Sequence, residues 1–130
     1  MDILVPNESE LELLSGQPVT DIDSAEFAAQ VLLEKGVKTV IVTLGSNGAL
    51  LVTDEKITHV PTFKVDVVDT TAAGDAFISG LATALIKGKS LEEAVRYGNA
   101  SGALAATEFG AQPSLPTADE VEELLKTSPR

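Results

Sequence analysis

The sequence predicts a single α/β domain over residues 1–130, built on a mixed and mostly parallel sheet that includes an antiparallel hairpin. Runs of branched aliphatic residues alternate with segments of helical periodicity, a pattern typical of helices packed on a buried sheet. The pair Asn47-Gly48 lies between two strand-like runs and indicates a tight hairpin turn. A chain of 130 residues can form one compact core and is short for two.

The first half of the chain should alternate strands and helices. In order, we expect a strand over 3–5, helices over 7–14 and 24–35, and strands over 37–43, 49–53 and 57–60. The strand over 37–43 is the clearest, because it is rich in β-branched side chains. The second helix should bury one face that carries Phe27, Val31 and Leu32. A strand connected through helices to the next strand implies parallel pairing.

The second half should be mainly helical. We expect a short strand over 65–68, helices over 72–87 and 90–107, and a last helix capped by Thr117. Phe77, Leu81 and Leu85 recur at helical spacing in the first of these helices. The small residues over 98–106 favour close packing of the next helix against a neighbour.

Composition excludes several classes of function. Nine basic and twenty acidic residues give a net charge of −11, which disfavours nucleic acid and anionic membrane surfaces as partners. Cysteine is absent, so disulfides and thiolate chemistry are excluded, and the one histidine, His59, is expected on a strand edge facing solvent. The sequence has no signal-peptide pattern, so we expect a cytoplasmic protein. The chain enters its first apolar run almost at once, as though preceding structure were missing.

The segment 69–77 has the strongest chemical pattern. A strand ends, a turn of small residues follows, and a helix begins with Asp75 in its first turn. Small residues let backbone N–H groups approach an anion, and a helix N-terminus favours negative charge. A carboxylate there can accept a proton from an attacking hydroxyl. The structural alternative is that Thr71 caps the helix and Asp75 complements its dipole.

Three further segments have both a structural and a functional interpretation. Residues 7–10 have the spacing of a capping box, with Asn7 as the cap and Glu10 reaching back. Taken alone, residues 43–48 indicate an ordinary hairpin connection, and residues 110–114 an ordinary Gly/Pro loop. The triplet at 88–90 is no P-loop, because Thr83 stands where the upstream glycine is required.

The string Asp69-Thr70-Thr71-Ala72-Ala73-Gly74-Asp75-Ala76-Phe77 closely resembles the C-terminal signature of the ribokinase, or PfkB, family of carbohydrate kinases. The segments at 7–10, 43–48 and 110–114 resemble other family motifs in the same order. The resemblance implies the three-layer, Rossmann-like ribokinase fold, and specifically its C-terminal half. It also implies transfer of the γ-phosphate of ATP to a sugar hydroxyl, with D-ribose giving ribose 5-phosphate as the expected reaction.

The resemblance implies a role for individual residues. Asp75 matches the base that deprotonates the sugar hydroxyl, and Ala72, Ala73 and Gly74 match the anion hole for the γ-phosphate. The nucleotide site would include Thr43, Gly45, Ser46 and Asn99, with Asn7 and Glu10 organising Mg²⁺ and phosphate. Asp69, Thr71 and Ser114 match the site of an activating monovalent cation, K⁺.

Family members also carry an N-terminal half with a Gly-Gly sugar-binding motif and a lid, and this sequence matches neither. We therefore expect an ATP-binding half with little or no kinase activity by itself, and a homodimer through the exposed edge of the strand over 3–5. The alternative is a non-catalytic folded fragment or scaffold without a competent nucleotide site. Another family substrate, such as adenosine or fructose 6-phosphate, also stays open, because sugar choice depends mostly on the N-terminal half.

Overall fold

The computed structural model describes residues 3–63, 73–107 and 117–127. Its contacts divide the chain into two compact units, Met1–Val60 and Pro61–Arg130. The expected single domain over residues 1–130 stays a prediction.

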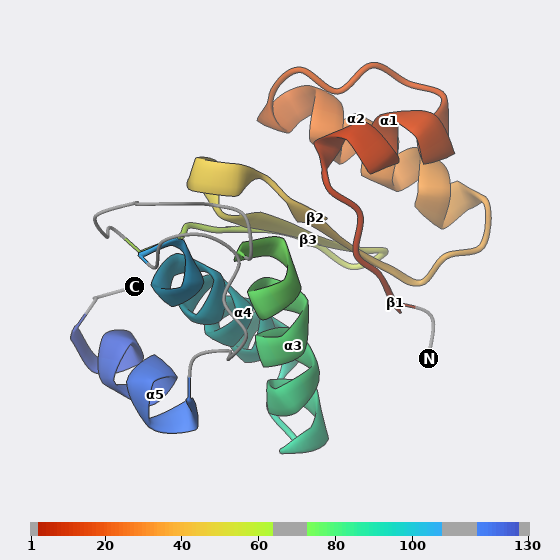
Figure 1. The fold of residues 1–130 in the computed structure, drawn as a ribbon. Helices are drawn as coiled ribbons and strands as arrows, with labels where there is room; N and C mark the ends of the chain where they lie inside the picture. Colours follow the sequence, from red (N-terminus) through yellow and green to blue (C-terminus); the bar gives the residue numbers. More distant parts are fainter. Residues whose placement is uncertain (1–2, 64–72, 108–116, 128–130) are drawn as a thin grey trace. The chain divides into compact units, whose positions relative to one another are not determined.

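The first unit is a four-stranded sheet covered on one face by two helices (Figure 1). Its elements are β1 (Ile3–Leu4), α1 (Glu8–Ser15), α2 (Ile22–Glu34), β2 (Thr39–Thr43), the 3₁₀ turn η1 (Gly45–Asn47), β3 (Ala49–Thr53) and β4 (Ile57–Val60). The strand order is β1-β2-β3-β4. β1 pairs parallel to β2, while β2–β3 and β3–β4 are antiparallel. The predicted α/β class, a mixed sheet with an antiparallel hairpin, is confirmed, although antiparallel pairing prevails in the described sheet, which was expected to be mostly parallel.

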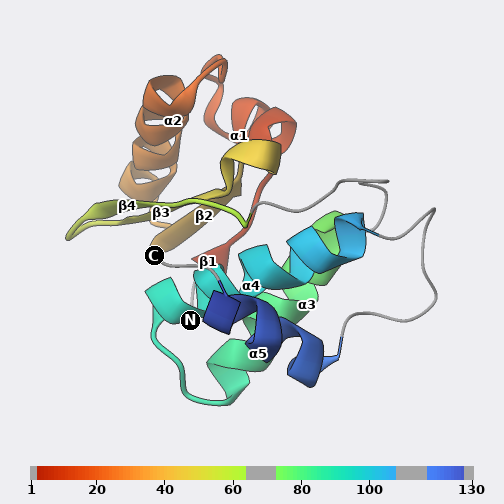
Figure 2. The same cartoon turned by 90° about the vertical axis from the view of Figure 1, so that its left-hand side faces the viewer.

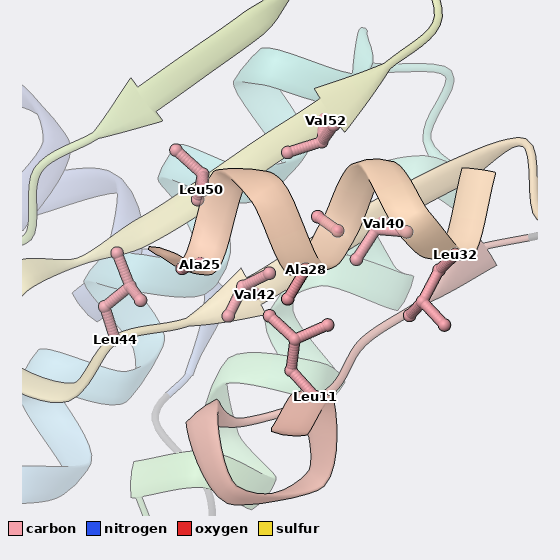
Figure 3. Packing of buried hydrophobic residues seen from close by; sticks show 10 residues of the cluster. Leu11, Ala25, Ala28, Leu32, Val40, Val42, Leu44, Leu50 and Val52 are labelled. Carbon is pink, nitrogen blue, oxygen red and sulfur yellow. The ribbon is translucent and has the colours of Figure 1, made fainter. Parts of the chain in front are cut away.

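The core of the first unit lies between α2 and the sheet (Figure 3). Val40 and Val42 of β2 alternate onto the same face as Leu50 and Val52 of β3, as the two-residue repeat of strands requires. Small side chains line the facing side of α2 and allow a close approach. The helical residues of this core are Leu11 from α1 and Ala25, Ala28, Ala29 and Leu32 from α2.

The predicted apolar face of α2 is wrong at Phe27, whose side chain is 56% exposed. The helix also begins at Ile22, two residues earlier than expected. Asp21 is the N-cap: its carboxylate accepts from the Ser24 N–H at 2.8 Å, and the Ser24 hydroxyl oxygen accepts from the Asp21 N–H at 2.9 Å. Hydrogen bonding of the Asp21 carboxylate to Ser24, first to its backbone and then to its side chain, lowers the pKa of Asp21. The buried stripe therefore follows the alanines and excludes Phe27.

The second unit consists of three helices, α3 (Ala73–Ile86), α4 (Leu91–Ala106) and α5 (Ala118–Thr127). Helix α3 lies along α4, and α5 packs on α4 (Figures 1 and 2). Thr117 caps α5, since its hydroxyl accepts from the Glu120 N–H at 3.2 Å. The three predicted helices are confirmed, whereas the strand predicted over 65–68 lies outside the described residues.

Glycines set the distance between α3 and α4. A Cβ atom added at Gly98 would lie 3.0 Å from the carbonyl oxygen of Phe77, and one added at Gly102 would lie 3.1 Å from that of Ala73. Both distances are tighter than ordinary van der Waals contact. The predicted close packing of the small residues over 98–106 is therefore confirmed, and it involves the first two turns of α3.

Helix α5 is held on α4 by apolar and polar contacts. Val121 is buried, and Arg96 Nη2 donates to the Leu125 carbonyl at 3.4 Å. Burial of the Tyr97 phenol, and then the negative charges of Glu122 and Asp119 on α5, raise the pKa of Tyr97. None of the helices in the described ranges has both the length and the apolar character needed to cross a bilayer.

Candidate functional site

The carboxyl ends of β1 and β2 bring two of the predicted residues together. Asn7 forms an isolated parallel bridge with Thr43, and the Thr43 N–H donates to the Pro6 carbonyl at 3.0 Å. Because β1 and β2 are parallel, the segments that follow them leave the sheet at the same edge. In open α/β sheets, ligands bind beyond the carboxyl ends of the strands. This edge is therefore the candidate binding edge of the first unit.

Asn7 and Glu10 form the predicted capping box. Asn7 Oδ1 accepts from the Glu10 N–H at 2.8 Å, and Glu10 Oε1 accepts from the Asn7 N–H at 2.9 Å. The structural interpretation of this motif is thus confirmed. The box uses one oxygen of each side chain, and both side chains are exposed. A second carboxylate oxygen of Glu10 lies outside the box, so a role in holding Mg²⁺ is compatible with the cap.

The turn after β2, residues 44–48, carries Gly45 and Ser46. It is closed by backbone hydrogen bonds from Leu44 N to Gly48 O at 2.8 Å and from Asn47 N to Leu44 O at 3.1 Å. Gly45 and Gly48 adopt φ angles of 59° and 87°, which glycine tolerates without strain. The turn therefore presents its backbone near the carboxyl end of β2. The side chain of Ser46 is outside the described part of the structure.

In the second unit, α3 begins with three of the predicted site residues. Ala73, Gly74 and Asp75 form the first turn of α3, and Asp75 is exposed. A Cβ atom added at Gly74 would meet no atom within 4 Å, so the backbone here faces open space. An exposed carboxylate beside free space at a helix start can both complement the dipole and reach a ligand. The predicted residues Asp69, Thr71, Ala72 and Ser114 lie outside the described residues.

Asn99 lies on α4 and is only 4% exposed. Its Nδ2 atom donates to the Pro61 carbonyl at 3.2 Å. One turn earlier on the same helix, the Arg96 guanidinium lies 5.0 Å from the centroid of the Phe63 ring. The contacts of Arg96 and Asn99 with residues 61–63 were not predicted, because no local motif marks contacts over more than thirty residues of sequence.

The predicted site residues thus fall into two groups, one in each unit. Asn7, Glu10, Thr43 and Gly45 lie at one edge of the sheet in the first unit. Ala73, Gly74 and Asp75 open α3 in the second unit, with Asn99 on the neighbouring helix. Among the described residues, His, Asp and Glu side chains form no group of three suited to hold a metal ion.

Strands that end at one edge and a helix that begins with small residues and an acid are typical of α/β proteins that bind anions at strand and helix ends. The sequence model of the pfkB family of carbohydrate kinases matches residues 1–118. The chain belongs to this family.

Individual family members resemble the chain closely. A ribokinase from Haemophilus influenzae is 45% identical over 126 residues, which are 97% of this chain and 41% of that protein. The structure of an Arabidopsis thaliana ribokinase complexed with ribose and ATP matches with a TM-score of 0.91 and 40% identity, covering 98% of this chain and 42% of that one.

The fold also matches that of a kinase that is not called a ribokinase. The structure of phosphofructokinase-2 from Escherichia coli in complex with potassium matches with a TM-score of 0.87 and 32% identity, covering 98% of this chain and 41% of that one. The chain therefore spans about 41–42% of the length of each of these three proteins.

Proposed function

We propose that this chain is the ATP-binding half of a ribokinase-like sugar kinase, which transfers the γ-phosphate of ATP to a hydroxyl of D-ribose and gives ribose 5-phosphate. The observation that carries the proposal is the exposed Asp75 in the first turn of α3, directly after Ala73 and Gly74. Membership of the pfkB family and the likeness to a ribokinase complexed with ribose and ATP support it. A kinase that uses ATP in this way is proposed to act in the cytoplasm.

Asp75 is proposed as the general base. Its carboxylate takes the proton of the sugar hydroxyl as that oxygen attacks the γ-phosphorus, and the bond to the departing ADP oxygen breaks. The backbone N–H groups of Ala72, Ala73 and Gly74 are proposed to form the anion hole for the charge on the γ-phosphate oxygens. The open space at Gly74 and the exposure of Asp75 are compatible with these roles.

The remaining site residues are proposed to hold the nucleotide and its cations. Thr43, Gly45, Ser46 and Asn99 would line the nucleotide site, and Asn7 and Glu10 would support Mg²⁺ and phosphate. Asp69, Thr71 and Ser114 would hold K⁺, an ion that phosphofructokinase-2 from Escherichia coli also binds. Oxygen ligands of these kinds suit both cations.

The 130 residues alone are proposed to bind nucleotide and to catalyse little or no phosphoryl transfer. Phosphoryl transfer depends on positioning both substrates, and this chain spans 41% of the length of the ribokinase that it matches. A homodimer through the edge of β1 remains part of the proposal, since β1 is the end strand of the described sheet.

Calorimetric titration with Mg²⁺-ADP and Mg²⁺-ATP in K⁺ buffer tests the proposal, with Gly74→Asp and Gly74→Asn as a matched pair. A Cβ atom added at this position meets no atom within 4 Å, and Asp is favoured in the first turn of a helix, so both variants should fold. We expect saturable binding by the parent chain. The loss of nucleotide affinity should be larger in Gly74→Asp than in Gly74→Asn, because only Asp places a negative charge against the phosphates. Absence of binding by the folded parent chain would favour the non-catalytic scaffold.

The base is tested in a full-length kinase that carries this half. Asp75→Asn should lower turnover by about 10²- to 10⁴-fold, the range of general base catalysis. Near-normal turnover would overturn the assignment of Asp75.

A further inference from the structure

His59 contacts the turn that follows β2, the same turn that carries Gly45 and Ser46. Its Nε2 atom lies 2.6 Å from the carbonyl oxygen of Asn47. A carbonyl oxygen only accepts hydrogen bonds, so the contact requires the ring proton on Nε2. The imidazole on the end strand β4 therefore donates to the backbone of the turn.

The register of the two hairpins brings His59 to this position. His59 of β4 pairs with Leu50 of β3, and Ala49 of β3 pairs with Thr43 of β2. β3 lies between β2 and β4 (Figure 2). Because Asn47 precedes Leu50 by only three residues, a long side chain opposite Leu50 can reach the carbonyl of Asn47.

The turn over residues 44–48 is buried at both ends, at Leu44 and Gly48, and exposed between them. The side chain of Leu44 is buried in the core of the first unit, whereas Gly45 and Asn47 are exposed. Gly45 and Gly48 carry positive φ angles, and glycine has the largest conformational freedom to lose on folding. A side chain that holds the exposed part of such a turn reduces the number of conformations from which a ligand must select.

We propose that His59 is a positioning residue of the nucleotide loop: by donating to the Asn47 carbonyl it holds residues 44–48 in the conformation that meets a nucleoside diphosphate or triphosphate. For the identity of the ligand the inference rests on the proposed function. For the contact itself it rests on the hairpin geometry alone.

Amide hydrogen exchange of the ligand-free chain, followed by NMR, tests the contact. In His59→Ala the N–H groups of Asn47 and Gly48 should exchange about three- to tenfold faster. This range corresponds to the net free energy that one hydrogen bond contributes. His59→Gln should restore slow exchange, because the Gln amide nitrogen can donate from a similar place. Ile57→Thr is the matched control: it changes another exposed residue of β4, keeps a β-branched side chain, and should leave both amides unchanged.

The dissociation constant of Mg²⁺-ADP tests the function of the contact. This constant should rise by about three- to tenfold in His59→Ala and return to the value of the parent chain in His59→Gln. Unchanged exchange in His59→Ala would overturn the contact, and faster exchange with unchanged affinity would overturn its role in nucleotide binding. Absence of binding by the parent chain would overturn the proposed function, while the exchange rates would still decide whether His59 holds the turn.

Discussion

At the scale of single residues, the capping hydrogen bond of Glu10 and its negative charge can be tested separately. One carboxylate oxygen accepts from the Asn7 N–H, and a glutamine in the same place can accept equally well. A role in organising Mg²⁺, in contrast, depends on the negative charge. The same position therefore allows the cap and the proposed ligand to be tested independently.

Glu10→Gln should leave the free energy of unfolding within about 0.5 kcal/mol of the parent, because the capping box survives. It should weaken binding of Mg²⁺-ADP by about tenfold, the value of one charge-assisted contact. Urea denaturation and calorimetry give the two quantities. Glu8→Gln removes a neighbouring charge of the first turn of α1 that is no part of the box, and it should change neither strongly. Equal affinities for both variants and the parent would remove Glu10 from the proposed Mg²⁺ site.

At the scale of elements, glycines let α3 and α4 approach closely, and Gly80 is the most constrained of them. A Cβ atom added at Gly80 would overlap the Ser101 hydroxyl oxygen and lie 2.8 Å from the Ser101 Cβ. Rotation of the hydroxyl can relieve the first contact, but a Cβ atom moves only with its backbone. In the same helix, Gly74 faces open space. The two glycines of α3 therefore form a natural pair for comparison.

Overpacking in Gly80→Ala should cost about 1–3 kcal/mol. Alanine also gains about 1 kcal/mol over glycine in a helix, so the free energy of unfolding should fall by up to about 2 kcal/mol. Gly74→Ala, as the control, meets no neighbouring atom and should therefore raise the free energy of unfolding by up to about 1 kcal/mol. Urea denaturation at one pH gives both values.

Combining Gly80→Ala with Ser101→Gly tests whether the clash is the cause. Ser101→Gly removes both the Cβ atom and the hydroxyl that the new methyl group would meet. The double variant should be more stable than the sum of the single changes predicts, by about 1–2 kcal/mol. Simple additivity would show that the two positions do not compete for the same space.

At the scale of the whole molecule, the sequence predicted what local chemistry determines. The β-branched run of β2 and the capping box of Asn7 and Glu10 each act within a few residues, and both are found as expected. The face of α2 was predicted less well, because the sheet decides which side is buried and Phe27 lies outside that side.

Contacts that depend on register were not accessible from the sequence. The hydrogen bond of His59 requires two hairpins to align, and the packing of Arg96 on Phe63 joins residues that are far apart in the chain. The family signature made Asp75 a candidate, since the motif itself is local. Its exposure in the first turn of α3 is what the structure adds.

Net charge gives the last prediction at this scale. The chain carries −11, so it should repel an anionic nucleotide at long range even though local N–H groups attract the phosphates. Raising ionic strength from about 0.01 M to about 0.15 M shortens the Debye length from ~30 Å to ~8 Å and screens this repulsion. The association rate of Mg²⁺-ATP should therefore rise by a factor of about two or more, since short-range contacts are screened less.

Stopped-flow measurements with choline chloride as the added salt, and K⁺ and Mg²⁺ held constant, give this rate. Adenosine carries no charge and serves as the control, because its association rate should not depend on salt. Mg²⁺-ADP, with less negative charge than Mg²⁺-ATP, should respond by a smaller factor. A rate for Mg²⁺-ATP that falls with salt would mean that a locally positive field at the site outweighs the charge of the whole chain, and that nucleotide is steered to the site instead of being repelled.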